Sequence, residues 1–291
     1  MSGQDTFFSS TFSLNLRGEL LELSTPRVMG ILNLTPDSFF DGGQFNSAAK
    51  AIEQCKKMLD EGADIIDIGA ASSRPGSEVL SAHDEWNRMS GILSQLVKEF
   101  PNAYFSIDTF HSTVAEKAID NGAHIINDIS GGEMDPKMYS IAAQLKCPLI
   151  VMHMQGTPQN MQDNPKYSHV VIEIIQNLQA KVFRAHEAGV LDLIIDPGFG
   201  FGKTVEHNFQ ILNQLDHFHL LKCPILAGLS RKSMIYKSLN SSSDEALNGT
   251  TALNMIAMEK GARLLRVHDV KEAKECVSLF TQLKAHEHRT D

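Results

Sequence analysis

The chain has 291 residues, 42% of them hydrophobic, and a formal net charge of −9 from 26 basic and 35 acidic side chains. This apolar content suffices for a sizeable core, and the length suits one large domain or two small ones. The acidic balance argues against a surface built broadly for nucleic acid or anionic lipid, but it is compatible with a local basic pocket for one small anion.

No apolar run approaches the roughly 18 residues of a membrane span. The first residues, Met1-Ser-Gly-Gln-Asp-Thr6, lack the basic start and apolar core of a signal peptide. We therefore expect a cytoplasmic protein that has neither a membrane nor a nucleic acid as partner. The cysteines show no metal-ligand or redox spacing and are expected to be small core residues: Cys55, Cys147, Cys223 and Cys276.

The first predicted element is a short hairpin with strands at Phe12–Leu16 and Leu20–Leu23, joined at Arg17-Gly18. Eight nearly continuous apolar runs follow, as is typical of buried parallel strands. In chain order they are Val28–Leu32, Ile65–Ile68, Tyr104–Ile107, His124–Ile129, Pro148–Met152, Leu191–Ile195, Pro224–Ala227 and Ala262–Val267.

Amphipathic helices are predicted between these runs. Apolar residues from Ala48 to Leu59 recur at helical spacing after the first run, and those from Ala273 to Phe280 do so after the last. Asp269 and Glu272 have the spacing of a capping box at the start of that last helix.

Eight strand–helix units predict an α/β fold, a closed (β/α)8 TIM barrel with a short N-terminal β-hairpin. An open doubly wound sheet is the structural alternative. The expected organisation is a hairpin segment at 1–26 that closes the bottom of the barrel, one barrel domain at 27–285, and a polar tail at 286–291.

Polar side chains follow each apolar run. Taken singly, such residues can be helix caps, as Ser230 and Asp269 could be, or solvated loop residues. In a barrel, however, all eight strand ends meet on one face, where enzymes of this fold place their active sites. The sequence therefore predicts a shared site there. Its candidates are Asn33, Arg74, Asp108, Asn127, His153, Asp196, Ser230, Lys232, Arg266 and His268.

The chemistry of these residues suggests a heterocycle that carries a phosphate or diphosphate. Arg266, His268 and Arg74 offer donors to phosphate oxygens, and Asn33 offers an oxygen to a phosphate-bound Mg²⁺ ion. Carboxylate and amide groups on the other strands would accept from ring N–H groups. Those acceptors are Asp108, Asn127 and Asp196, and the apolar walls would come from Phe39, Met152, Phe199 and Phe201.

The glycine-rich segment 196–203 does not match a nucleotide-binding loop. Pro197 stands where a Walker loop needs glycine, and Lys203 stands where a dinucleotide fingerprint needs glycine or alanine. The glycines more plausibly permit a tight turn at a strand end. For His153 we favour a structural role over a catalytic one, and for His217 and His219 a packing role.

At this point the sequence resembles the dihydropteroate synthase family from Val28 to Phe280. Eight motifs carry the resemblance, in order and one at each strand end. They are residues 30–39 with 41–43 (GILNLTPDSF, DGG), 73–76 (SRPG), 106–109 (SIDT), 126–129 (INDI), 152–156 (MHMQG), 196–203 (DPGFGFGK), 230–234 (SRKSM) and 266–270 (RVHDV).

The resemblance implies a dimeric barrel that condenses 6-hydroxymethyl-7,8-dihydropterin diphosphate with p-aminobenzoate and releases diphosphate. It also implies that the loops 33–43 and 73–76 move and close over the reactants. By residue, it implies a pterin site at Asp108, Asn127, Met152, Asp196 and Lys232, and a diphosphate site at Asn33, Arg266 and His268, with Mg²⁺ at Asn33. The p-aminobenzoate pocket would comprise Phe39, Ser73, Arg74, Pro75, Phe201 and Ser230.

The family often has Gly-Gly-Glu-Ser-Thr-Arg-Pro-Gly after the second strand, whereas this chain has Gly69-Ala-Ala-Ser-Ser-Arg-Pro-Gly76. The change puts the shape of the p-aminobenzoate pocket in doubt, through Ala70, Ala71 and Ser73, but leaves the pterin site untouched. Two other functions remain open. One is the pterin domain of a methyltransferase, and the other is a non-catalytic pterin-binding relative.

Overall fold

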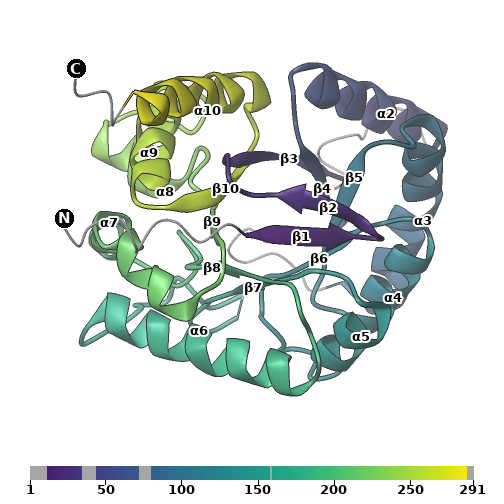
Figure 1. Cartoon of the computed structure of the whole chain (residues 1–291), viewed down its shortest axis with the longest axis horizontal. Helices are drawn as coiled ribbons and strands as arrows, with labels where there is room; N and C mark the ends of the chain where they lie inside the picture. The colour runs from purple at the N-terminus through teal and green to yellow at the C-terminus, as the bar shows by residue number, and fades with distance from the viewer. Residues whose placement is uncertain (1–11, 35–43, 72–79, 158, 287–291) are drawn as a thin grey trace.

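The computed structural model describes residues 12–34, 44–71, 80–157 and 159–286. A two-stranded antiparallel hairpin precedes a closed barrel of parallel strands, which the helices surround (Figure 1). The barrel order is β10-β3-β4-β5-β6-β7-β8-β9, so the last strand closes against the first. The predicted (β/α)8 barrel with an N-terminal hairpin is confirmed, and the open doubly wound sheet is wrong.

Every barrel strand overlaps one of the eight predicted apolar runs. The strands are β1 Ser13–Leu16, β2 Glu19–Glu22, β3 Arg27–Asn33, β4 Ile65–Gly69, β5 Tyr104–Asp108, β6 Ile125–Asp128, β7 Leu149–Met152, β8 Leu193–Asp196, β9 Ile225–Ala227 and β10 Ala262–Val267. The largest difference is at β8, because Leu191, which the predicted run included, lies before the strand and is 83% exposed.

Helices follow the strands around the barrel. They are α2 Gln44–Asp60, α3 Ala82–Glu99, α4 Ser112–Asp120, α5 Met138–Leu145, α6 Val170–Glu187, α7 Val205–Asn213, α8 Ser233–Ser238, α9 Leu247–Glu259 and α10 Val270–Ala285, with a 3-10 helix, η1, at Leu215–Leu221. Within the described ranges, none of them is long and apolar enough to cross a membrane. All four cysteines are buried and free, as expected of small core residues.

The hairpin closes the end of the barrel where the strands begin. Arg17 and Gly18 both have positive φ angles, 58° and 100°, which suits a two-residue turn whose twist matches that of the strands. Figure 1 shows β1 and β2 lying across one end of the barrel. Their leucines pack against inward-facing residues near the strand starts, among them Ile65, Ile125 and Ile194. The opposite end, where the strands finish, therefore stays free for a site.

The predicted capping box at α10 is wrong. Asp269 precedes the helix, but its side chain makes no capping hydrogen bond. Its two carboxylate oxygens instead accept from Nε of Arg231 at 2.9 Å and from the terminal NH2 of Arg231 at 2.7 Å. A paired guanidinium binds a carboxylate more strongly than backbone N–H groups do, which accounts for the change of partner. Ser230 does not cap a helix either, since α8 begins after Lys232.

Candidate functional site

The register of the barrel brings the predicted polar residues together at its carboxyl end. Neighbouring strands pair Asn33 with Gly69, Gly69 with Asp108 and Asp108 with Asn127, and further around the barrel Met152 pairs with Asp196. Arg266 lies on β10, which pairs with β3 and so completes the circle. The convergence predicted from the sequence is confirmed for these residues.

Arg266 links two carboxylates across the barrel. Its Nε donates to Oδ2 of Asp67 and its terminal NH2 donates to Oδ2 of Asp108, both at 2.6 Å. Asn127 also donates to Oδ2 of Asp67, at 3.0 Å. Burial acts to lower the pKa of Arg266, but the two carboxylates outweigh it and raise the pKa. Arg266 is therefore a permanent cation held in one orientation by two strands.

Asp67 is a site residue that the sequence analysis missed. It lies inside the apolar run of β4 and is fully buried. Its side chain points to the barrel interior, where it meets Arg266 and Asn127. The available signal was a charged residue inside the predicted run Ile65–Ile68, whose other three residues are isoleucines. A buried carboxylate needs a cationic or hydrogen-bonding partner, and the arginine that supplies one lies 199 residues away in the chain.

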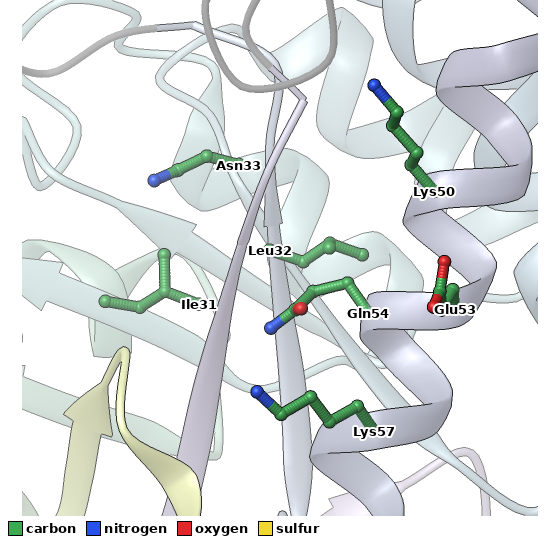
Figure 2. A pocket seen from close by; sticks show the side chains of 7 residues that line it. All are labelled: Ile31, Leu32, Asn33, Lys50, Glu53, Gln54 and Lys57. Atoms are coloured by element: carbon green, nitrogen blue, oxygen red, sulfur yellow. The ribbon is translucent and has the colours of Figure 1, made fainter.

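Asn33 lies beside Asp108 because Gly69 separates them without a side chain. A methyl group added at Gly69 would lie 3.7 Å from Oδ1 of Asn33 and 3.7 Å from Oδ2 of Asp108. Figure 2 shows Asn33 and Ile31 on one side of β3, with Leu32 on the side that faces α2. Asn33 also borders an open cavity of about 660 Å³ between β3 and α2. The Asn33 side chain points away from α2, and its amide lies near the carboxylate of Asp108 at the end of the barrel where the strands finish.

Asp196 and Lys232 face each other across Gly228. A methyl group added at Gly228 would lie 4.0 Å from Oδ2 of Asp196 and 3.9 Å from Nζ of Lys232. Burial raises the pKa of Asp196, while Lys232 and the N–H of Gly198, which donates to Oδ1 at 2.7 Å, act to lower it. Burial also lowers the pKa of Lys232 to about 8, against the opposing effect of Asp196.

The segment after β8 gives the site one of its apolar walls. Nζ of Lys232 donates to the carbonyl of Phe199 and lies 4.6 Å from the ring centroid of Phe201. Phe201 packs on an apolar cluster that includes Met152, so both residues fit the role predicted for them. Phe199 was expected to be a wall as well, and this is wrong. Its ring is fully buried in the main core, since it points away from the side that Phe201 faces.

Lys203 fixes this segment to the end of β7. Its Nζ lies 2.8 Å from the carbonyl of Gly198, 2.9 Å from that of Phe201, and 3.0 Å from Nδ1 of His153. The backbone approaches so closely that a methyl group at Gly198, where φ is +73°, would lie 1.9 Å from the carbonyl oxygen of His153. Burial and Lys203 lower the pKa of His153 to about 2, so His153 is a neutral acceptor. This buried, hydrogen-bonded position agrees with the structural role favoured for His153.

Lys181 makes a second buried link, between the ends of β6 and β7. It is fully buried on α6 and donates to the carbonyl oxygens of Ser130 and Met152, each at 2.8 Å. No role was predicted for Lys181 from the sequence. The sequence did contain a sign that Lys181 is buried. Helical spacing places this lysine on the same face as the apolar residues Ile174, Leu178 and Ala185.

Ser230 and His268 form a hydrogen-bonded pair. The Ser230 hydroxyl accepts from the backbone N–H of His268 at 3.1 Å and lies 3.0 Å from Nδ1 of the same ring. Between Ser230 and Lys232, Arg231 has a φ of 54° and is held by Asp269. The resemblance assigns Ser230 to the p-aminobenzoate pocket and His268 to the diphosphate site. The hydrogen bond between them therefore connects the two predicted subsites.

Four of the predicted residues, Phe39, Ser73, Arg74 and Pro75, lie outside the described residues. Within the part of the chain that the structure describes, no group of three or more His, Cys, Asp or Glu side chains could hold a metal ion. The available metal ligand of the predicted set is the neutral amide oxygen of Asn33. One such oxygen fits a Mg²⁺ ion whose other ligands are phosphate oxygens and waters, because Mg²⁺ commonly keeps several waters.

Comparisons with known proteins agree with this geometry. Residues 29–268 match the family described as "Pterin binding enzyme". The chain is 42% identical to the dihydropteroate synthase of Escherichia coli over 263 residues, which cover 90% of this chain and 93% of the relative. It also resembles the crystal structure of the Yersinia pestis dihydropteroate synthase with a sulfonamide drug, with a TM-score of 0.88, 40% identity and coverage of 94% and 100% of the two chains. For the Xanthomonas albilineans enzyme with 7,8-dihydropteroate the TM-score is 0.84, the identity 35%, and the coverage 94% and 99%.

Proposed function

The chain belongs to the pterin-binding enzyme family and, within it, to the dihydropteroate synthases, and from this premise we propose how its residues divide the work of the reaction. The enzyme is a transferase that condenses 6-hydroxymethyl-7,8-dihydropterin diphosphate with p-aminobenzoate to give 7,8-dihydropteroate and diphosphate. The C–O bond between the pterin methylene and the diphosphate breaks. A C–N bond to the amine of p-aminobenzoate forms, and the amine loses a proton.

The pterin lies, in this proposal, among Asp108, Asn127 and Asp196, with Met152 and Phe201 against its ring. Asp196 is the main support for this pterin site. Its Oδ1 accepts from the N–H of Gly198, and its Oδ2, which faces Lys232, is available to a ligand. A buried carboxylate discriminates strongly between ligands that have N–H donors, as the edge of a pterin does, and ligands that lack them. A ligand without donors would leave the carboxylate unpaired.

In this proposal the diphosphate lies next to Arg266, near the end of β10, and next to His268, which directly follows that strand. Arg266 is a cation held by Asp67 and Asp108, so it is already oriented to stabilise negative charge as the C–O bond lengthens. Asp196 would face the positive charge that develops on the pterin and its methylene. We therefore propose a dissociative displacement, in which p-aminobenzoate captures a cation-like pterin and no protein nucleophile takes part.

A Mg²⁺ ion is proposed to act with the diphosphate, held on the protein by Asn33. When bound, it would supply Lewis-acid stabilisation of charge on the leaving diphosphate. Asn33 would orient the ion and its phosphate beside Arg266. Removing Mg²⁺ with a chelator should abolish turnover, and Asn33→Ala should raise the Mg²⁺ concentration needed for half-maximal rate. Equal Mg²⁺ dependence of variant and wild type would contradict this role for Asn33.

The p-aminobenzoate is proposed to bind between Phe201 and the loops that carry Phe39, Ser73, Arg74 and Pro75, with Ser230 nearby. Support for the pocket comes from Phe201, which borders Lys232 and the apolar cluster of Met152. The Yersinia pestis relative has been crystallised with a sulfonamide, which resembles the aromatic amine. Sulfonamides should therefore inhibit this enzyme competitively with p-aminobenzoate.

We propose a homodimer as the working form. Apolar side chains on α9 and α10 are exposed, namely Ile256 at 43%, Leu279 at 66% and Leu283 at 56%, and a second copy would cover them. Sedimentation equilibrium should give twice the mass of the chain, and Leu279→Glu should shift the mass toward the monomer. A monomer at micromolar concentration would contradict the proposal. The cytoplasmic location stays a prediction, and cell fractionation would test it.

An assay of diphosphate release separates the synthase from the two other functions considered. We expect release that requires both the pterin diphosphate and p-aminobenzoate, with dihydropteroate formed in equal amount. Asp196→Asn should weaken pterin binding by about 2–3 kcal/mol, whereas Asp192→Asn is a matched control. Asp192 lies just before the same strand, at the hairpin end, where it accepts from the backbone N–H of Asn15 at 3.2 Å. Release that never depends on p-aminobenzoate would refute the synthase assignment.

A further inference from the structure

The hydroxyl of Ser230 has two hydrogen-bonding contacts on the same residue, His268. It accepts from the backbone N–H of His268 at 3.1 Å, and it lies 3.0 Å from Nδ1 of the ring. Among the described residues this hydroxyl makes no other hydrogen bond, and Ser230 is only 5% exposed. Among the described residues, Nδ1 is therefore the acceptor toward which the hydroxyl proton can point.

A serine hydroxyl has one proton to donate and two lone pairs that accept. One lone pair is taken by the N–H of His268. If Nδ1 carried a proton, that proton would occupy the second lone pair, and the hydroxyl proton would be left buried without an acceptor, at a cost of about 1–3 kcal/mol. If Nδ1 is unprotonated, the hydroxyl donates to it and every group is satisfied. The pair therefore favours the His268 tautomer that has its proton on Nε2.

The surroundings keep the ring neutral. Removal of water by the crowded strand ends, together with the positive charge of Arg266, lowers the pKa of His268. Arg231 and Lys232 act in the same direction, and Asp269, which is paired with Arg231, acts against them. The removal of water is incomplete, because His268 keeps an exposed surface. Since Nδ1 faces Ser230, Nε2 is the ring nitrogen left for a ligand.

We propose that Ser230 is a positioning residue that fixes the neutral Nε2–H tautomer of His268, so that His268 presents a hydrogen-bond donor to the departing diphosphate. This rests on the proposed function for the identity of the ligand, but the tautomer itself is a property of the free protein. The wrong tautomer would present a lone pair to phosphate oxygens, which repels them. Fixing the tautomer of a histidine through its second ring nitrogen is a recurring device in catalytic sites.

Nitrogen-15 NMR of histidine-labelled, substrate-free protein tests the tautomer directly. A His268→Gln variant identifies the signals of His268 among the twelve histidines. We expect Nδ1 to have a pyridine-like shift and Nε2 a pyrrole-like shift at pH 7.5. In Ser230→Ala the two shifts should move toward an average of both tautomers, and in Ser230→Thr, which keeps the hydroxyl, they should stay in place. A pyrrole-like Nδ1 in the wild-type protein would overturn the proposal, whatever the enzyme catalyses.

Kinetics of the same variants test the consequence for catalysis. Ser230→Ala should lower kcat/KM for the pterin diphosphate by about 10- to 100-fold, as is typical when the partner of a site histidine is removed. Ser230→Thr, which keeps the hydroxyl, should restore most of that loss. A Ser230→Ala variant that alters only the KM for p-aminobenzoate and leaves kcat/KM for the pterin diphosphate unchanged would contradict the positioning role.

Discussion

Replacing Asp67 with asparagine tests whether the orientation of Arg266 depends on the buried carboxylate of β4. The substitution keeps the shape of the side chain and removes its charge. Arg266 loses one of its two carboxylate partners, because the 2.6 Å contact to Asp67 becomes a neutral hydrogen bond, while the pair with Asp108 remains. Hydrogen bonds to charged groups contribute about 1.5–3 kcal/mol, so we expect a loss of that order.

The loss should appear in two independent measurements. Urea denaturation should show a lower free energy of unfolding by about 1.5–3 kcal/mol, and kcat/KM for the pterin diphosphate should fall by about 10- to 100-fold. Ser106→Ala is the matched control. Ser106 pairs with Asp67 in the register of β4 and β5 and is equally buried, and its hydroxyl has no hydrogen-bond partner within the described part of the chain. Its replacement should leave both quantities nearly unchanged.

A double-mutant cycle with Asp108→Asn sharpens the test. Each single variant leaves Arg266 one carboxylate, whereas the double variant leaves it none, and an unpaired buried charge is far more costly. The free energy of unfolding should therefore fall by more in the double variant than the sum of the two single changes. Additive effects, or an Asp67→Asn variant that behaves like Ser106→Ala, would refute the idea that these two carboxylates hold Arg266 jointly.

Three further predictions concern single side chains. Asp196→Asn should weaken pterin binding by about 2–3 kcal/mol in calorimetry, and an unchanged dissociation constant would exclude its contact with the pterin. Lys203→Met should lower the free energy of unfolding by roughly 3 kcal/mol in urea, since it leaves buried acceptors unpaired, and a neutral effect would contradict its linking role. Glu85 is 1% exposed, and burial raises its pKa to about 7. The pKa of Glu85 in the folded protein is above its value of 4.5 in the unfolded chain. Its contribution to the free energy of unfolding is therefore fully present below pH 4.5 and is lost as the pH rises through 7. Glu85→Gln should thus match wild type near pH 4.5 and be more stable by about 2–3 kcal/mol at pH 8, and equal stability curves would exclude this titration.

The sequence predicted the barrel because its signals are local. Nearly continuous apolar runs indicate strands buried on both faces, and the helical spacing between them indicates the surrounding layer. The site residues at strand ends, such as Asp108, Asn127 and Arg266, could be located for the same reason, since a barrel directs every strand end to one face. Recognition of the motifs then supplied the family.

Partners could not be predicted in this way. Asp269 has the spacing of a helix cap but pairs with Arg231, and Phe199 belongs to an aromatic pair of which only Phe201 faces the site. Both outcomes depend on which groups the fold brings within a few ångströms. For Asp269, the guanidinium of Arg231 is a stronger partner than the backbone of the helix that Asp269 precedes. For Phe199, the direction of the turn decides that its ring enters the core.

Composition, periodicity and motif order determined by themselves the class of fold, the face that carries the site, and the family. Only the tertiary structure decided that Asp67 and Asp108 share Arg266, that Lys181 and Lys203 link neighbouring strand ends, and that Ser230 bonds to His268. The physical reason is that burial makes every polar group depend on a partner, and those partners come from strands far apart in the chain, where spacing along the sequence carries no information about contact.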